Sequence, residues 1–175
     1  MDRPVLPAGH LRVNYQANRV VLSVAPGLAG DFDGNNTLDC LDVDALVAEI
    51  VAGTNMPAFD LNGDAAVDNF DLTQWLADAG AVNLASGNPY LPGDANLDGV
   101  VDGQDFIEWN THKFTNTAKW CSGDFNADGV VDGADFITWN GNKFTSSDSF
   151  VAVPEPGLVP AVLGWMVWIF RRRAA

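Results

Sequence analysis

Apolar and polar positions largely alternate near the start of the chain. Residues 11–24 read LRVNYQANRVVLSV, with apolar side chains at Leu11, Val13, Tyr15, Val20, Leu22 and Val24. Alternation with a period of two is typical of a β-strand with one buried face. We therefore expect a β-hairpin that turns near Ala17–Asn18. An isolated hairpin is barely stable in water. Two interpretations stay open: a strand pair packed on the segments that follow, or the closing strands of a larger β-rich extracellular domain.

Farther along, the apolar spacing becomes near-helical. The first such run is Val43, Leu46, Val47, Ile50 and Val51, and the second is Leu72, Trp75 and Leu76. Two later runs match each other position by position: Phe106, Ile107, Trp109 and Phe114, then Phe136, Ile137, Trp139 and Phe144. This spacing predicts short helices with a shared apolar core. We assign the tryptophans to that core because they recur at matched helix positions. The alternative is that they are exposed platforms for stacking on sugars.

A polar, acidic segment precedes each predicted helix. Residues 93–115 read GDANLDGVVDGQDFIEWNTHKFT, and residues 123–145 read GDFNADGVVDGADFITWNGNKFT. Two weaker copies begin at Asp31 and Asp60, so four loops start at residues 31, 60, 94 and 124. Clusters of Asp, Asn and Gly are also common in ordinary turns. Four clusters in register, each followed by an apolar helix start, favour a repeated binding loop instead.

The spacing of oxygen-bearing residues is that of a calcium loop. Ca²⁺ takes six to eight oxygen ligands, which a 12-residue loop supplies from positions 1, 3, 5, 7, 9 and 12, with a backbone carbonyl at position 7. The predicted ligands, with position 7 contributing its carbonyl, are Asp31, Asp33, Asn35, Thr37, Asp39 and Asp42; Asp60, Asn62, Asp64, Ala66, Asp68 and Asp71; Asp94, Asn96, Asp98, Val100, Asp102 and Asp105; and Asp124, Asn126, Asp128, Val130, Asp132 and Asp135. We expect up to four Ca²⁺.

Position 6 of such a loop makes a sharp turn with a positive φ, which glycine adopts freely. Gly99 and Gly129 occupy this position in the third and fourth loops. The first loop has Asn36, and Asn tolerates this conformation. The second has Ala65, at a cost on the order of 1 kcal/mol. We therefore expect the second loop to be the weakest site.

These repeats resemble dockerin type I repeats, whose pattern is D-x-N-x-D-G-x-x-D-x-x-D. The resemblance covers about residues 30–145. It implies calcium-stabilised pairs of loop–helix units, each lacking the entering helix, and a cohesin domain as partner. In that family, polar residues at loop positions 10 and 11 contact cohesin, often as Ser/Thr. Those positions here hold Cys40–Leu41, Asn69–Phe70, Gly103–Gln104 and Gly133–Ala134.

Composition changes this interpretation little. Sixteen of the 23 acidic residues lie in the four loops, so the predicted calcium ligands account for most of the negative charge behind the net value of −14. It argues against nucleic acid, which needs basic patches. No nucleophile elbow, phosphate loop or other catalytic constellation is present, so we expect no enzyme. Cys40 and Cys121 are the two cysteines. A disulfide and two free thiols are both open.

The C-terminus ends in VPEPGLVPAVLGWMVWIFRRRAA. Its parts are Pro154–Pro156, an apolar run from Gly157 to Phe170, and Arg171–Arg173. This order resembles a PEP-CTERM sorting signal, which implies retention of an exported protein at the inner membrane and cleavage by an exosortase. The arginines would stay cytoplasmic. The run is about 21 Å long as a helix, against about 30 Å of hydrocarbon. The alternative is a buried core helix.

These patterns predict a mainly α protein. We expect a β-hairpin in 1–27, a dockerin-like pair in 28–80, a linker in 81–92, a second pair in 93–145, a linker in 146–156, and a transmembrane helix with an Arg tail in 157–175. Small cores of this size are marginal alone, so calcium should supply much of the folding free energy. The predicted function is an exported, calcium-binding, non-catalytic spacer and anchor at the inner membrane or cell surface. The alternatives are a cohesin-binding dockerin in a polysaccharide-degrading assembly and the tail of a larger secreted glycoside hydrolase.

Overall fold

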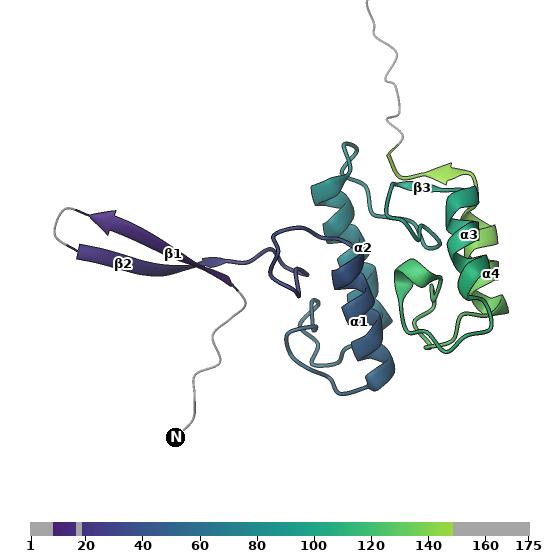
Figure 1. The fold of residues 1–175 in the computed structure, drawn as a ribbon, viewed down its shortest axis with the longest axis horizontal. Helices are drawn as coiled ribbons and strands as arrows, with labels where there is room; N and C mark the ends of the chain where they lie inside the picture. The colour runs from purple at the N-terminus through teal and green to yellow at the C-terminus, as the bar shows by residue number, and fades with distance from the viewer. Residues whose placement is uncertain (1–8, 17–18, 149–175) are drawn as a thin grey trace, which may run out of the picture.

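The computed structural model describes residues 9–16 and 19–148. Within them the chain is mainly helical, as predicted (Figure 1). The elements in order are β1 (Gly9–Gln16), β2 (Arg19–Pro26), α1 (Cys40–Ala52), α2 (Asn69–Asn83), β3 (Val100–Val101), α3 (Gly103–His112), the 3-10 helix η1 (Trp120–Ser122), α4 (Gly133–Asn142) and β4 (Thr145–Ser146).

The predicted N-terminal hairpin is present. Strands β1 and β2 pair antiparallel, from Gln16 opposite Arg19 to Gly9 opposite Pro26. The expected turn at Ala17–Asn18 lies outside the described residues. Figure 1 shows the hairpin standing apart from the helices, so the described structure does not show it packed on the first repeats.

Each α-helix begins directly after the ninth residue of a predicted loop. Asp39, Asp68, Asp102 and Asp132 are the N-caps, and each accepts a hydrogen bond from the backbone N–H two residues ahead. The twelfth residue of each loop is the third residue of the helix, and its carboxylate accepts the N–H of the N-cap in return. This reciprocal capping satisfies backbone donors that a helix start otherwise leaves unpaired. The same residues therefore end the loop and start the helix.

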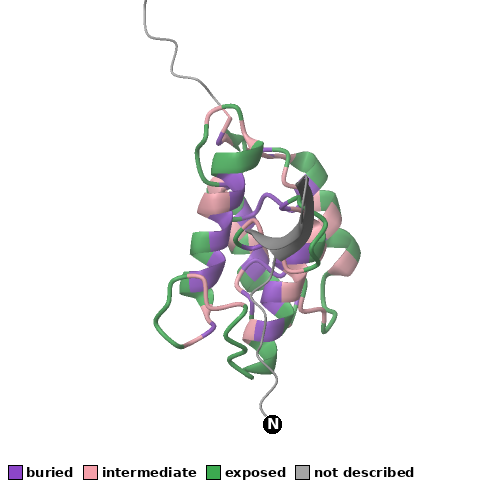
Figure 2. Cartoon of the chain, turned by 90° about the vertical axis from the view of Figure 1, so that its left-hand side faces the viewer, coloured by how far each residue is buried: buried purple, intermediate pink, exposed green. Residues whose placement is uncertain are grey.

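The first two helices form the core that their spacing predicts. Val43, Leu46, Val47, Leu72, Trp75 and Leu76 are all buried, which confirms those assignments. The indole N–H of Trp75 donates to the carbonyl of Gly30 at 3.0 Å, so the aromatic core also fixes the entrance of the first loop. Figure 2 shows buried positions alternating with intermediate and exposed ones along the helices. Val51 was wrongly placed in this core: it is 43% exposed, close to the C-terminal end of α1.

The last two helices pack through four aromatic rings, those of Phe106, Trp109, Phe136 and Trp139. Ring centroids from opposite helices lie 5.1 Å apart for Phe106 and Trp139, and 5.1 Å apart for Trp109 and Phe136. Both tryptophans are 9% exposed, which confirms that they belong to the core rather than to a sugar platform.

Four other side chains predicted to join this core do not. Ile107 and Ile137 are 59% and 71% exposed, and Phe114 and Phe144 are each 78% exposed. Successive helical residues are rotated by about 100°, so an isoleucine next to an inward-facing phenylalanine turns outward. Each late phenylalanine lies two residues beyond the end of its helix with a φ of 65° or 64°. That left-handed backbone turns the chain away before the ring can reach the core.

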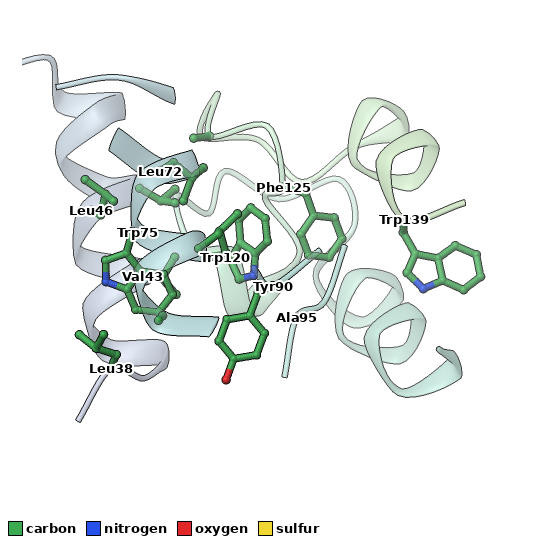
Figure 3. Packing of buried hydrophobic residues seen from close by; sticks show 14 of the residues in the cluster. Leu38, Val43, Leu46, Leu72, Trp75, Tyr90, Ala95, Trp120, Phe125 and Trp139 are labelled. Atoms are coloured by element: carbon green, nitrogen blue, oxygen red, sulfur yellow. The ribbon is translucent and has the colours of Figure 1, made fainter. Parts of the chain in front are cut away.

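The two loop–helix pairs share one hydrophobic cluster. Figure 3 shows Trp120 and Tyr90 in its middle, between Val43 on one side and Phe125 on the other. Trp120 is 1% exposed and Tyr90 is 4% exposed. A disulfide joins Cys40 at the start of α1 to Cys121 in η1, which decides between the two states left open for these cysteines.

No helix within the described ranges is long and apolar enough to cross a membrane. The predicted transmembrane segment, 157–175, and the motif at Pro154–Pro156 lie outside the residues that the structure describes.

Candidate metal centres

The first aspartate of each loop organises the loop around its own carboxylate. In the third loop, Asp94 Oδ1 accepts the N–H of Asp98 at 3.3 Å, and Oδ2 accepts the N–H of Gly99 at 2.9 Å. The other three loops repeat the bond from the sixth residue to the first at 2.9–3.0 Å. The four loops thus bend in the same way around Asp31, Asp60, Asp94 and Asp124.

Positions 3 and 5 form successive turns closed by side chains. The side-chain oxygen of position 3 accepts the N–H of position 5 at 2.8–3.0 Å in all four loops. The side-chain oxygen of position 5 accepts the N–H of position 7 at 2.7–2.9 Å. Asp and Asn form such turns through hydrogen bonds to backbone two residues on. These bonds bend the backbone of positions 3–7 into a tight loop.

The last aspartate closes the loop. Asp42, Asp71, Asp105 and Asp135 are all 0% exposed. One carboxylate oxygen accepts the N–H of position 2 at 2.7–2.9 Å. The other accepts the N–H of position 9 at 2.7–3.0 Å. The oxygen that accepts from position 2 also accepts the N–H of position 3, at 3.2–3.4 Å. Each buried carboxylate therefore ties the beginning of its loop to the helix that follows, and the oxygen bonded to position 9 keeps a lone pair for a further partner.

In the first loop the carboxylates converge closely enough to hold a metal ion. Oxygens of Asp31, Asp33 and Asp42 all lie within 4.8 Å of one another. Asp31 and Asp42 are buried and Asp33 is exposed, so this group lies at the surface with its base in the protein. In the other loops position 3 is Asn62, Asn96 or Asn126, and an amide oxygen stands where the first loop has its third carboxylate.

Positions 7 and 9 both take part in the hydrogen bonds of the loop. The backbone N–H groups of Thr37, Ala66, Val100 and Val130 are held by position 5. The aspartates at position 9 use one oxygen to cap the helix. In the first loop the other oxygen of Asp39 accepts the Thr37 hydroxyl at 2.9 Å.

Burial disfavours the ionised form of these carboxylates and so raises their pKa values. Burial, followed by the charge of Asp105, raises the pKa of Asp94 to about 7. Burial is also the main cause that raises the pKa of Asp124 to about 6. The pKa values of Asp42, Asp105 and Asp135 are raised as well, again chiefly by burial. A bound cation would relieve this penalty, because an opposite charge favours the ionised form.

The backbone adopts the predicted sharp turn at position 6 in every loop. The φ angles are 67° at Asn36, 70° at Ala65, 86° at Gly99 and 87° at Gly129. The sequence reasoning missed a second left-handed residue at position 4, where Gly34 and Gly63 have a φ of 79° and Leu97 and Ala127 have φ values of 58° and 56°. The two glycines at aligned positions were an available signal, but Leu97 and Ala127 carried none.

The sequence reasoning also missed how the third and fourth loops are joined. The indole N–H of Trp109 donates to the carbonyl of Asp132 at 2.8 Å, and that of Trp139 donates to the carbonyl of Asp102 at 2.8 Å. Each helix thereby holds the ninth position of the other unit's loop.

The predicted ligand positions of the loops offer a metal ion carboxylate, amide and carbonyl oxygens, and no sulfur or imidazole nitrogen. Such a donor set fits a hard cation of the Ca²⁺ or Mg²⁺ type, rather than Zn²⁺ or copper. Comparison with protein-family models, with curated proteins and with solved structures finds no match for this chain.

Proposed function

We propose that the chain is a calcium-binding, non-catalytic spacer module of an exported protein, with one Ca²⁺ site in each of four loops. The observation that carries the proposal is the repetition of one hydrogen-bonded loop geometry at residues 31–42, 60–71, 94–105 and 124–135. A single acidic cluster has many explanations. Four loops with the same turn positions, the same buried final aspartate and the same order of oxygens favour a common ligand.

Calcium suits these loops better than magnesium. Ca²⁺ accepts six to eight oxygens in flexible geometry, whereas Mg²⁺ demands a near-ideal octahedron and usually keeps several waters. Here the first, third, fifth and twelfth side chains and the seventh carbonyl come from a continuous stretch of backbone. Such a dense all-protein set would replace most of the water around the ion. Four bound Ca²⁺ would reduce the net charge from −14 to about −6.

The similarity to dockerin repeats belongs to this proposal. The capped helices and calcium-type loops agree with what that resemblance implies. A cohesin-like partner is the second candidate, because position 11 carries exposed apolar side chains in the first two loops: Leu41 is 64% exposed and Phe70 is 71% exposed. A pull-down with immobilised cohesin domains tests it, with Leu41→Asp and Phe70→Asp as the interfering variants. Position 10 of the first loop is Cys40, whose sulfur is committed to the disulfide.

Export is supported by the disulfide. Such bonds form and persist in oxidising compartments and are rare in the cytosol. With it we propose that residues 154–173 act as a PEP-CTERM-like signal, held in the inner membrane and cleaved by an exosortase-like enzyme. The module would then space or anchor an extracellular domain. The third candidate function, the tail of a larger secreted glycoside hydrolase, is one case of this arrangement, in which the extracellular domain is the hydrolase.

Calorimetric titration with Ca²⁺ tests the proposal. The third and fourth loops have the full ligand set and glycine at position 6, so Asp94→Ala and Asp124→Ala should each remove one tight site. Asp78→Ala is the matched control, because Asp78 is an acidic residue on α2 outside every loop. If the tight phase is the same in both loop variants as in the control, the ligand assignment is wrong.

A further inference from the structure

The segment that follows α4 lies directly on the third loop. Strand β4 pairs antiparallel with β3, which is positions 7 and 8 of that loop. The N–H of Phe144 donates to the carbonyl of Val101 at 2.6 Å, and the N–H of Ser147 donates to the carbonyl of Gly99 at 2.8 Å. Residues 144–147 therefore form a short ladder with the same stretch of backbone that would present the Val100 carbonyl to a cation.

A second set of bonds holds the same segment from the other side. The N–H of Ser86 donates to Asp148 Oδ1 at 2.9 Å. The Ser86 hydroxyl and the Asn88 side-chain amide both donate to the carbonyl of Ser147, at 2.8 and 2.9 Å. Ser147 is only 4% exposed as a result. Ser147 and Asp148 are thus held between the third loop and the connection after α2.

The fourth loop supplies an internal comparison. There the N–H of Phe114 donates to the carbonyl of Val131 at 2.6 Å, and the N–H of Val131 donates to the carbonyl of Thr115 at 3.0 Å. This is the same docking of a post-helix segment on position 8 of a loop. After Thr115, however, the chain continues into η1 and the protein core. The contact on the third loop instead involves the last residues that the structure describes, 144–148.

A ladder of two-residue strands has little stability of its own. Its geometry depends on the backbone of residues 99–101, which in turn depends on the loop. In that loop the carboxylates of Asp94 and Asp105 are both 0% exposed, and like charges buried in one small loop repel each other. A cation between them would remove the repulsion that opposes the loop, and would so favour the backbone arrangement that the ladder needs.

We propose that the third loop is a calcium-dependent clamp on the junction between the folded body and the C-terminal tail. This rests on the proposed calcium function. When the loop holds Ca²⁺, residues 144–148 are fixed, and when it loses Ca²⁺ they detach. Because an extended chain spans at most about 3.5 Å per residue, the five released residues can span up to about 18 Å. Calcium occupancy therefore sets whether residues 144–148 stay docked on the folded body.

Trypsin provides a local readout, because a lysine precedes each docked phenylalanine. Cleavage after Lys143 reports release of the segment on the third loop, and cleavage after Lys113 reports release of its counterpart on the fourth. The experiment uses the full chain, in detergent, with CaCl₂ as the probe and mass spectrometry of the fragments. The matched variants are Asp98→Asn and Asp128→Asn, at position 5 of the third and fourth loops, where both side chains are exposed. Circular dichroism checks that both variants fold.

Linkage gives the size of the effect. At free Ca²⁺ about ten times the dissociation constant of the loop, binding lowers the open population about tenfold. Cleavage of a rapidly opening segment follows that population, so Asp98→Asn should speed cleavage after Lys143 by up to about tenfold and change cleavage after Lys113 much less. Asp128→Asn should do the reverse.

Calorimetric titration of the same samples with Ca²⁺ distinguishes a failure of the proposed calcium function from a failure of the clamp alone. If wild-type protein takes up no Ca²⁺, the calcium function fails and the clamp fails with it. If Asp98→Asn loses a calcium site but its cleavage after Lys143 stays at the wild-type rate, calcium binding stands and the clamp is overturned. Equal acceleration at both lysines in both variants also overturns it, because the effect would then be global.

Discussion

Ala65 is the residue whose replacement should strengthen the second loop. It occupies the sharp turn at position 6 with a φ of 70°, where the third and fourth loops have glycine. Its side chain is exposed, so replacing it removes no core packing. Its N–H donates to Asp60 Oδ2 at 3.0 Å, and glycine keeps that bond. The substitution Ala65→Gly therefore changes little except the conformational preference of the turn.

Two opposing contributions set the magnitude. A left-handed backbone costs an L-residue about 1–2 kcal/mol relative to its preferred conformation. Glycine returns about 0.4–1 kcal/mol of that gain by making the unfolded chain more flexible. The net gain is about 0.5–1 kcal/mol, which corresponds to about two- to fivefold in apparent calcium affinity where loop formation and binding are coupled. Asn36→Gly in the first loop is the control, because Asn already tolerates this conformation and should gain less.

Calcium titration followed by two-dimensional NMR resolves the loops individually through the amide signals of residues 63–66 and 34–37. The expected result is tighter binding at the second loop of Ala65→Gly, with the third and fourth loops unchanged. An unchanged or weaker second site would refute the argument that backbone strain at position 6 limits this loop.

Metal-free protein should melt at a higher temperature at about pH 5 than at about pH 7.5, because the pKa values of Asp94 and Asp124 are raised to about 7 and about 6 in the folded state. Above the usual aspartate pKa the folded state then binds more protons than the unfolded state, so the stability of the folded state falls as the pH rises from about 5 to about 7.5. Saturating Ca²⁺ competes with protons for these carboxylates and should reverse the trend. A melting temperature that rises with pH in the metal-free protein would contradict the burial argument. Replacing both cysteines by serine should lower the free energy of unfolding in urea by about 2–4 kcal/mol, since the disulfide spans 81 residues and joins the two pairs; an unchanged midpoint would mean that the pairs stay docked without it. Mass spectrometry of the mature protein from its native host should find a C-terminus near residues 153–157, and an intact Ala175 on a soluble protein would refute the sorting signal.

The loops were predictable because their interactions are local. Asx turns join residues two positions apart, and the N-cap aspartate at position 9 lies three residues before the aspartate at position 12 that bonds back to it. Twelve consecutive residues therefore contain all the hydrogen bonds that shape the loop. The spacing of Asp94–Asp105 therefore fixed both the loop and the start of α3. The positive φ at Asn36 and Ala65 followed from register alone.

Features that depend on distant parts of the chain were not predictable. Composition and spacing left both states open for Cys40 and Cys121, because their approach depends on how the two pairs dock. The docking of residues 144–148 on the third loop is likewise long-range. The exposure of Ile107 and Ile137 has a different cause: the pattern showed apolar residues on the helix, but only the packed partner decides which neighbour of Phe106 or Phe136 faces inward.

Equilibrium dialysis of the folded protein against radioactive Ca²⁺, at physiological ionic strength and with excess Mg²⁺ as competitor, tests the central claim most directly. The account predicts saturable uptake that approaches four Ca²⁺ per chain, falls by one in Asp94→Ala and by one in Asp124→Ala, and stays unchanged in Asp78→Ala. Uptake that Mg²⁺ abolishes, or that is the same in the loop variants as in the Asp78→Ala control, would contradict it.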